Sequence, residues 1–244
     1  MIIFDRTPAT YQEGWAIIKQ LLEKWHQVTL DWNEADHRLI VADLEEKSSA
    51  SLPPSLRQWI YLNETMIKSG QWLLRDFHDI NYRTDIDAVT LMIQGEEDYY
   101  WAVKREHLTQ PDPPVDGYSI DYQGRVQWDK PVSPTLTEFL ITYLLDYHMM
   151  FEGTGGYNAT VADKAALIEA FTAGLPHTVV IGGYHIFESE HVLAFIQDAF
   201  SDRTKADLSV HYSGSPDHLP DCIRNNFRHQ GSYYGPAITK KEQV

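Results

Sequence analysis

The sequence has 244 residues, of which 43% are hydrophobic, so the chain is long enough to bury a substantial core and is not expected to be disordered. Its 35 acidic and 20 basic residues give a formal net charge of −15. A nucleic-acid-binding protein needs a basic face, so this charge argues against nucleic acid as a partner. The charge is compatible with a basic protein partner, although acidity also serves solubility alone.

The sequence contains one cysteine, Cys222, which bears on whether the protein is held together by disulfides or by zinc. One cysteine excludes a disulfide framework and makes a cysteine-based zinc site very improbable. The first residues lack the basic segment and apolar core of a signal peptide, and no apolar run approaches the roughly 20 residues of a membrane helix. We therefore expect a cytoplasmic protein that does not enter a membrane.

Apolar periodicity in the first half of the chain predicts helices first and hairpins second. A helix is expected over 9–27, because Thr10 and Glu13 have the spacing of a capping box and the apolar residues that follow share one face. Prolines at 53 and 54 predict the start of another helix, since the N–H groups of a first turn have no intrahelical partner. The other elements expected here are a strand over 28–32, a helix over 36–48, hairpins over 88–103 and 118–128, and a helix over 135–150.

The second half of the chain predicts helices alternating with strands. Three glycines lie among residues 153–156, and this run is the best candidate for a boundary between domains at 1–150 and 151–244. Gly182 and Gly183 predict a bulge or a turn, and residues 213–244 carry little periodicity and are expected to wrap over the surface. The elements expected here are a helix over 163–173, a strand over 178–181, a second helix over 189–200 with Ser189 as its N-cap, and a strand over 206–212.

Together these elements predict an α+β fold, in which helices pack on a mostly antiparallel sheet. Residues 151–244 then form either a small αβαβ module or an extension of the first sheet. Most of the seven tryptophans lie on the apolar faces of expected elements, so we assign them to the core.

The acidic excess is concentrated in the first half, where residues 1–150 carry 24 acidic and 13 basic residues. We interpret it as a candidate surface for docking a protein partner, with Trp128 as an exposed anchor, since aromatic residues dominate binding hot spots. The alternative is that the acidic residues are simply solvated and that Trp128 belongs to the core. The acidic residues of this candidate surface are Asp76, Asp79, Asp85, Asp87, Glu96, Glu97 and Asp98.

Patterns that indicate catalysis or a cofactor do not occur in this sequence. The glycine run at 153–156 lacks the Gly-Lys-Ser/Thr ending of a phosphate-binding loop, and the 11 histidines include no His-Glu-x-x-His pattern. No Gly-x-Ser-x-Gly nucleophile elbow is present either. We therefore expect no catalytic residue, no metal site and no cofactor. The alternative is an enzyme whose site is assembled from scattered residues in a cleft between the two halves.

Three short motifs follow one another between about residues 35 and 150. The first joins the acidic segment 40–46 to Leu-Pro-Pro-Ser-Leu-Arg-Gln-Trp at 52–59. The second is Trp-Ala-Val at 101–103 followed by Asp-Pro-Pro-Val at 112–115, and the third is Ser-Pro-Thr-Leu-Thr-Glu-Phe-Leu at 133–140. In this order the motifs resemble the SMI1/KNR4 proteins of the SUKH superfamily. The resemblance leaves residues 151–244 outside it.

The resemblance implies an α+β fold and a non-enzymatic role in protein binding. Bacterial members of the family look like immunity proteins, which neutralise a toxin, often a nuclease, by binding it, and fungal members act as regulatory scaffolds. For this chain the resemblance implies an acidic surface that takes the place of phosphates in the cleft of a basic toxin, with a regulatory scaffold as the alternative. The motif residues themselves are expected to serve the fold: Leu52, Pro53, Trp59, Trp101, Asp112, Pro113 and Pro114.

Overall fold

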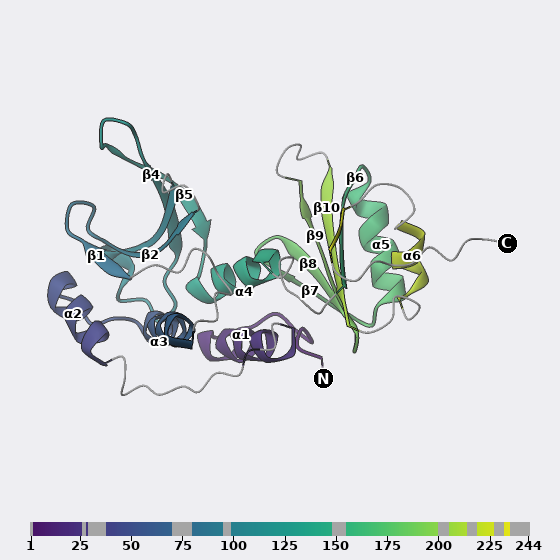
Figure 1. Cartoon of the computed structure of the whole chain (residues 1–244), viewed down its shortest axis with the longest axis horizontal. Coiled ribbons are helices and arrows are strands. Elements are labelled where there is room, and N and C mark those ends of the chain that lie inside the picture. The colour runs from purple at the N-terminus through teal and green to yellow at the C-terminus, as the bar shows by residue number, and fades with distance from the viewer. Residues whose placement is uncertain are drawn as a thin grey trace. The chain divides into compact units, whose positions relative to one another are not determined.

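The computed structural model describes residues 2–25, 28, 38–69, 80–94, 99–147, 155–199, 205–213, 219–226 and 232–234 (Figure 1). The chain forms two compact units. The first unit comprises Ala9–Tyr143, and the second unit combines Met1–Pro8 with Leu144–Val244. The division therefore lies at Tyr143 and Leu144 rather than between 150 and 151, and the first eight residues belong with the second unit.

The structure describes three helices within the first unit and a fourth, α4, that begins in the first unit and ends in the second. They are α1 (Tyr11–Lys24), α2 (Arg38–Ser48), α3 (Pro54–Ser69) and α4 (Leu136–Tyr147). The predicted cap of α1 is confirmed, because the Thr10 hydroxyl accepts the Glu13 N–H at 3.3 Å. The Glu13 carboxylate in turn accepts the Ala9 N–H at 2.7 Å. Both bonds satisfy N–H groups near a helix start that have no partner within the helix. The strand predicted over 28–32 lies outside the described residues apart from Val28.

The first unit contains a five-stranded antiparallel sheet in the order β1-β2-β3-β4-β5, so each strand pairs with the next one along the chain. Both hairpins predicted from the sequence are confirmed. A short 3₁₀ helix, η2 (Arg105–His107), follows the third strand. The strands are β1 (Asn81–Arg83), β2 (Ala88–Gln94), β3 (Tyr99–Lys104), β4 (Val115–Ile120) and β5 (Val126–Ser133).

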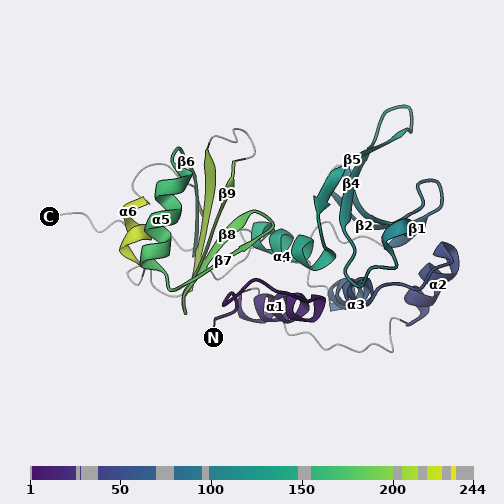
Figure 2. The ribbon, with the colours of Figure 1, turned by 180° about the vertical axis from the view of Figure 1, so that it is seen from behind.

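The two faces of this five-stranded sheet differ. Trp101 lies on the inner face, where its ring centroid is 5.7 Å from that of Phe139 and 5.9 Å from that of Tyr143, both on α4. Tyr100 and Tyr118 are paired on neighbouring strands, and Tyr118 is paired with Trp128. Successive side chains of a strand point to opposite faces, so these three aromatic residues lie on the other face, which we call the outer face. Figure 2 shows the hairpins of this sheet from behind.

The second unit contains a six-stranded antiparallel sheet in the order β11-β6-β10-β9-β8-β7. Helices α5 (Lys164–Gly174) and α6 (Asp221–Asn226) lie on one face of it (Figure 1). Phe171 of α5 packs there against Phe187, with ring centroids 5.3 Å apart. The strands are β6 (Gly155–Val161), β7 (His177–Ile181), β8 (Tyr184–Glu188), β9 (Val192–Asp198), β10 (Ala206–Tyr212) and β11 (Ser232–Tyr234).

The second unit is α+β, as predicted, but it is not an αβαβ module. Residues 189–200 were expected to form a helix, and Val192–Asp198 is strand β9 instead. Five consecutive residues of β9 from Val192 are buried, so both faces of the strand are apolar. Such a run has no alternation, and its apolar residues also fit helical spacing. Gly155 begins a strand rather than a linker, and residues 213–244 contribute α6 and β11.

The turn predicted at Gly182 and Gly183 is confirmed as the connection between β7 and β8. Its two residues have φ values of 57° and 81°, which is the left-handed region that favours glycine. A two-residue hairpin loop with two positive φ values matches the twist of the flanking strands.

Residues 2–4 also belong to the second unit, and a buried carboxylate holds them there. Glu188 has no exposed surface, and its Oε2 accepts the N–H of Ile3 at 2.6 Å and the N–H of Phe4 at 2.8 Å. Ile3 and Phe4 are themselves buried. The contact joins residues that are more than 180 positions apart in the sequence.

Candidate functional site

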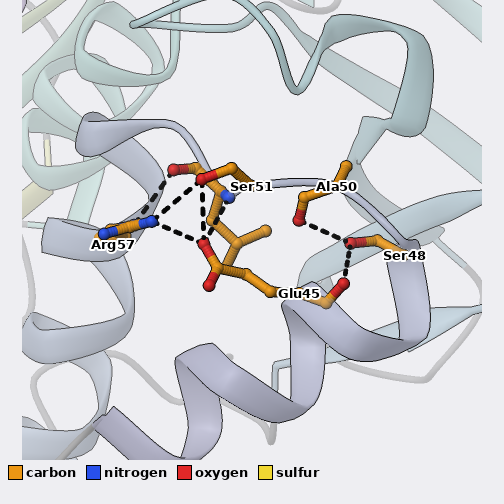
Figure 3. A network of polar contacts seen from close by, with 6 residues as sticks. Glu45, Ser48, Ala50, Ser51 and Arg57 are labelled. Atoms are coloured by element: carbon orange, nitrogen blue, oxygen red, sulfur yellow. Dashed lines mark hydrogen bonds and ion pairs between the residues drawn. The ribbon is translucent and has the colours of Figure 1, made fainter.

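The first of the three sequence motifs folds around the carboxylate of Glu45 (Figure 3). Glu45 Oε1 accepts the Leu52 N–H at 2.8 Å and the Arg57 guanidinium at 2.6 Å. Arg57 also donates from Nε to the Leu52 carbonyl at 3.1 Å, and the Ser51 hydroxyl completes the network at 3.3 Å from Glu45 Oε1. These bonds tie the end of α2 to the start of α3, so the motif has a structural role.

The electrostatics of this network favour the charged form of Glu45. Partial burial acts to raise the pKa of Glu45, but the Leu52 N–H and the Arg57 charge together lower it below its ordinary value. About a third of each charged side chain stays exposed, at 30% for Glu45 and 40% for Arg57, so solvent weakens the pair.

The second and third motifs are joined in the same way. Asp112 Oδ1 accepts the Thr137 N–H at 3.1 Å, and the Thr137 hydroxyl donates to the other oxygen of Asp112. Asp112 therefore binds the first turn of α4, where N–H groups have no helical partner. The Ser55 N–H donates to the Pro111 carbonyl at 3.3 Å, so the Leu-Pro-Pro and Asp-Pro-Pro segments are in direct contact.

The remaining motif residues are placed in the interior of the first unit. Trp101 packs on α4 as described above, and Pro114 is half-buried. The side chains of the other motif residues are buried: Leu52, Pro53, Trp59 and Pro113. These side chains therefore belong to the interior of the first unit, and the structural role that the sequence predicts for them stays a prediction.

The outer face of the five-stranded sheet carries an aromatic cluster centred on Tyr118. The Tyr118 ring lies parallel to that of Tyr100, with centroids 4.8 Å apart and planes 8° apart. The Trp128 ring lies 5.0 Å from Tyr118 on the neighbouring strand. Tyr118 is fully buried, whereas Tyr100 and Trp128 are half-buried. The half-buried apolar residues of this face are Ile86, Tyr100, Ile120, Val126 and Trp128.

Charged groups accompany the aromatic cluster. Lys104 Nζ lies 4.6 Å from the centroid of the Trp128 ring and 3.2 Å from Asp116 Oδ1. The Arg83 guanidinium lies 5.8 Å from the Tyr118 ring and donates to the Tyr118 hydroxyl at 3.3 Å. Asp116 is buried, with 1% of its surface exposed. The face therefore combines partly exposed aromatic side chains with paired charges.

The predicted acidic surface is only partly within the described structure. Asp85 forms an ion pair with Arg83, whose hydrogen bonds hold the pKa of Asp85 below its usual range. Asp87 accepts a hydrogen bond from the Tyr82 hydroxyl, and burial together with this bond raises the pKa of Tyr82. Both carboxylates lie in the turn between β1 and β2. Asp76, Asp79, Glu96, Glu97 and Asp98 lie outside the described residues.

The structure places Trp128 between the two sequence interpretations, because it is half-buried against Tyr118 and half-exposed. Sequence reasoning did not find Tyr100, Lys104, Asp116 or Tyr118 as its neighbours. The signal was present in the period-two alternation of the strands. This alternation shows which residues of one strand share a face. It does not show which residues of β3, β4 and β5 lie next to one another, because that depends on the register of the three strands.

A second polar cluster lies in the second unit. The Tyr184 hydroxyl donates to Asp146 Oδ2 at 2.6 Å, and Asp207 accepts from the Thr160 hydroxyl at 2.8 Å. Desolvation of the carboxylate, with a smaller effect from the negative charge of Asp207, raises the pKa of Asp146 to about 6. More than a third of Asp146 nevertheless remains accessible, so solvent screens part of this effect.

Comparisons with known proteins add no relative. No protein-family model, curated protein or solved structure matches the chain. Within the described ranges, no group of three or more His, Cys, Asp or Glu residues is placed to hold a metal ion. None of the helices described is long and apolar enough to cross a membrane.

Proposed function

We propose that this chain is a non-enzymatic protein-binding module that docks its partner on the outer face of the five-stranded sheet. The observation that carries the proposal is the half-exposed aromatic cluster around Trp128. In keeping with the resemblance to the SMI1/KNR4 proteins, the partner is a basic protein, and neutralisation of a basic toxin is the specific role we propose.

The composition of the outer face supports this proposal. Aromatic side chains at the centre of an interface contribute most of the binding energy, and a polar rim surrounds them in typical complexes. Here Tyr100 lies on the middle strand β3 and Trp128 on the edge strand β5, and Asp85 lies in the turn at the start of β2. Asp121 lies in the turn between β4 and β5. Carboxylates at such positions accelerate encounter with a basic protein.

The contacts between the three motifs support the resemblance itself. Glu45 with Arg57, Ser55 with Pro111, and Asp112 with Thr137 connect the motifs into one framework. A framework of this kind explains why these residue types are needed at this spacing. The contacts of this framework lie at the ends of α2, α3 and α4. None of the three contacts involves a residue of the aromatic cluster on the outer face.

Capture of the partner from the source cell tests the proposal when variants are compared. Trp128→Glu is expected to remove the binding of a protein that the unchanged chain retains, because a carboxylate would replace the central aromatic surface. Tyr122→Ser, at a side chain that is 93% exposed in the β4–β5 turn, tests whether this turn takes part in binding, with little risk to folding. Val180→Glu is the matched control, since Val180 is an apolar residue of the second unit that is 47% exposed.

Equal recovery of the retained protein by Trp128→Glu and Val180→Glu would contradict docking on the outer face. Circular dichroism and the unfolding midpoint of each variant separate a loss of binding from a loss of fold.

The charge of the partner is tested separately. Replacing Glu96, Glu97 and Asp98 with lysine is expected to slow association with a basic partner at low salt and to leave the fold intact. Stopped-flow association rates over a range of salt concentrations measure this. Rates that depend neither on these substitutions nor on salt would show that electrostatic attraction has no part in docking.

A further inference from the structure

Asp116 carries an unsatisfied carboxylate oxygen beneath the aromatic cluster. Its Oδ1 lies 3.2 Å from Lys104 Nζ, but its Oδ2 is buried and accepts no hydrogen bond within the described part of the chain. Leaving a buried acceptor without a partner costs free energy, and the cost is larger for a charged group. This oxygen therefore has the capacity to bind one more N–H donor.

Lys104 satisfies Asp116 incompletely. Its ammonium lies 4.6 Å from the Trp128 centroid and close to only one of the two carboxylate oxygens. The Lys104 side chain is 27% exposed, so it reaches solvent, and its four-carbon stem is flexible. Asp116 and Trp128 thus already bind a cation, the Lys104 ammonium. This ammonium leaves Asp116 Oδ2 without a hydrogen bond.

A guanidinium group fits these two partners better than an ammonium group does. Its planar fork donates two parallel N–H bonds, one to each oxygen of a carboxylate. It also stacks on an indole ring through its flat face. The site therefore offers a guanidinium both the second acceptor that Lys104 leaves unpaired and the ring that Lys104 covers.

We propose that Asp116 and Trp128 form a recognition site for an arginine side chain of the basic partner, and that Lys104 occupies this site until the partner exchanges with it. The proposal rests on the proposed function for the identity of the partner. The exchange keeps a cation beside the buried Asp116 carboxylate at every stage. It therefore avoids the large cost of an uncompensated buried charge.

Two features of recognition follow from this exchange. A neutral side chain cannot displace Lys104, because it would leave Asp116 without a counter-ion. A partner lysine gains nothing over Lys104, because it brings the same ammonium group. Arginine is the one protein side chain that both replaces the charge and satisfies the second oxygen. The site thus selects among basic partners.

The test uses the full chain with Lys104→Ala, which vacates the site. N-acetyl-arginine amide and N-acetyl-lysine amide are titrated separately, and the indole N–H resonance of Trp128 is followed by NMR. We expect a saturable shift, with arginine amide binding about threefold or more tightly than lysine amide. Adding Asp116→Asn is expected to weaken arginine amide binding by roughly tenfold. Equal affinity for the two amides, or the same affinity without the Asp116 carboxylate, would overturn the proposal.

Because Lys104→Ala exposes a buried charge and risks unfolding, a second measurement uses the unchanged protein. A ring current from Trp128 is expected to shift the ε-methylene resonance of Lys104 upfield. Arginine amide should move this resonance toward its value in water, and lysine amide at the same concentration should move it less. No displacement by arginine amide at roughly 100 mM would also overturn the proposal.

The two proposals fail in different ways. If Trp128→Glu abolishes capture but arginine amide shows no preference, the docking face stands and the arginine site is rejected. If arginine amide binds as expected but Trp128→Glu leaves capture unchanged, Asp116 and Trp128 bind arginine, but the docking face and the role of the site in partner recognition are rejected.

Discussion

The two sheets of this protein are both antiparallel, but they present their faces differently. In the second unit β9 and β10 each carry runs of five buried residues, so neither face of the central strands is offered to solvent. In the first unit β2 carries a run of the same length, from Ala88 to Met92, but Tyr100 on β3 and Trp128 on β5 stay partly exposed on the outer face. The outer face of the first sheet therefore keeps aromatic side chains at the surface, whereas the two central strands of the second sheet keep theirs in the core.

Two glutamates, one in each unit, use their carboxylates differently. Glu188 is buried and binds two backbone N–H groups, whereas Glu45 is partly exposed and shares its charge with Arg57. We therefore expect Glu188 to contribute more to the stability of the fold than Glu45 does. Desolvation strengthens the hydrogen bonds of Glu188, whereas water competes for those of Glu45.

The largest effect is expected from the core of the second sheet. Phe171→Ala should lower the free energy of unfolding by about 4 kcal/mol, because Phe171 has no exposed surface and its loss leaves a cavity against Phe187. Trp128→Ala should lower it by only about 1–2 kcal/mol, since that side chain is already partly exposed to water. Urea unfolding measures both, and a larger loss for Trp128 would reverse the comparison of the sheets.

A smaller effect is expected at the buried carboxylate. Glu188→Ala leaves the N–H groups of Ile3 and Phe4 without an acceptor and should cost about 3 kcal/mol. Hydrogen exchange of these two amides should accelerate by a large factor in the variant. Glu190→Ala is the control, because Glu190 is exposed two residues away. Unchanged exchange would show that Glu188 does not hold this segment.

The partly exposed carboxylate of Glu45 should contribute less to the free energy of unfolding than Glu188 does. Its contribution should depend on pH. Arg57→Ala is expected to cost about 0.5–1 kcal/mol, in the range of partly exposed ion pairs. The folded pKa of Glu45 lies below its ordinary 4.5, so its contribution is complete above that value and is lost as the pH falls through the folded pKa. The difference between Glu45→Gln and the unchanged chain should therefore shrink in acid. A constant difference down to about pH 2 would contradict this.

The smallest effect, with the opposite sign, is expected at Asp146. Its pKa is raised to about 6 in the folded protein from 3.8, so the folded state binds the proton more tightly. Stability should fall as the pH rises between these two values. Asp146→Asn should therefore melt at a slightly higher temperature than the unchanged chain above pH 6 and should match it near pH 4. A lower melting temperature at neutral pH would show that the charged form is favoured.

Local signals predicted much of the fold. The Thr10 cap, the start of α3 at the proline pair and the Gly182–Gly183 turn depend on a few neighbouring residues, and all three were predictable from the sequence. Strand β9 was not, because a segment buried on both faces loses the alternation that distinguishes a strand from a helix.

The candidate site was less predictable than the fold. Trp128 was identified by its residue type, but its partnership with Lys104 and Asp116 requires the register of β3, β4 and β5. Register is decided by the packing of whole strands and is not visible in any one of them. The acidic residues were visible as a composition, yet Asp85 and Asp87 are already engaged by Arg83 and Tyr82.

The bond between residues 3–4 and Glu188 has a consequence for synthesis on the ribosome. Every residue of the first unit is made before Glu188 is, so that unit can complete its own contacts while the segment ahead of it still waits for its acceptor. The second unit, in contrast, must recover residues 3–4, which left the ribosome before the first unit did. Closing so long a loop is entropically expensive, so the second unit is expected to mature last and to be the more sensitive of the two to changes near the start of the chain.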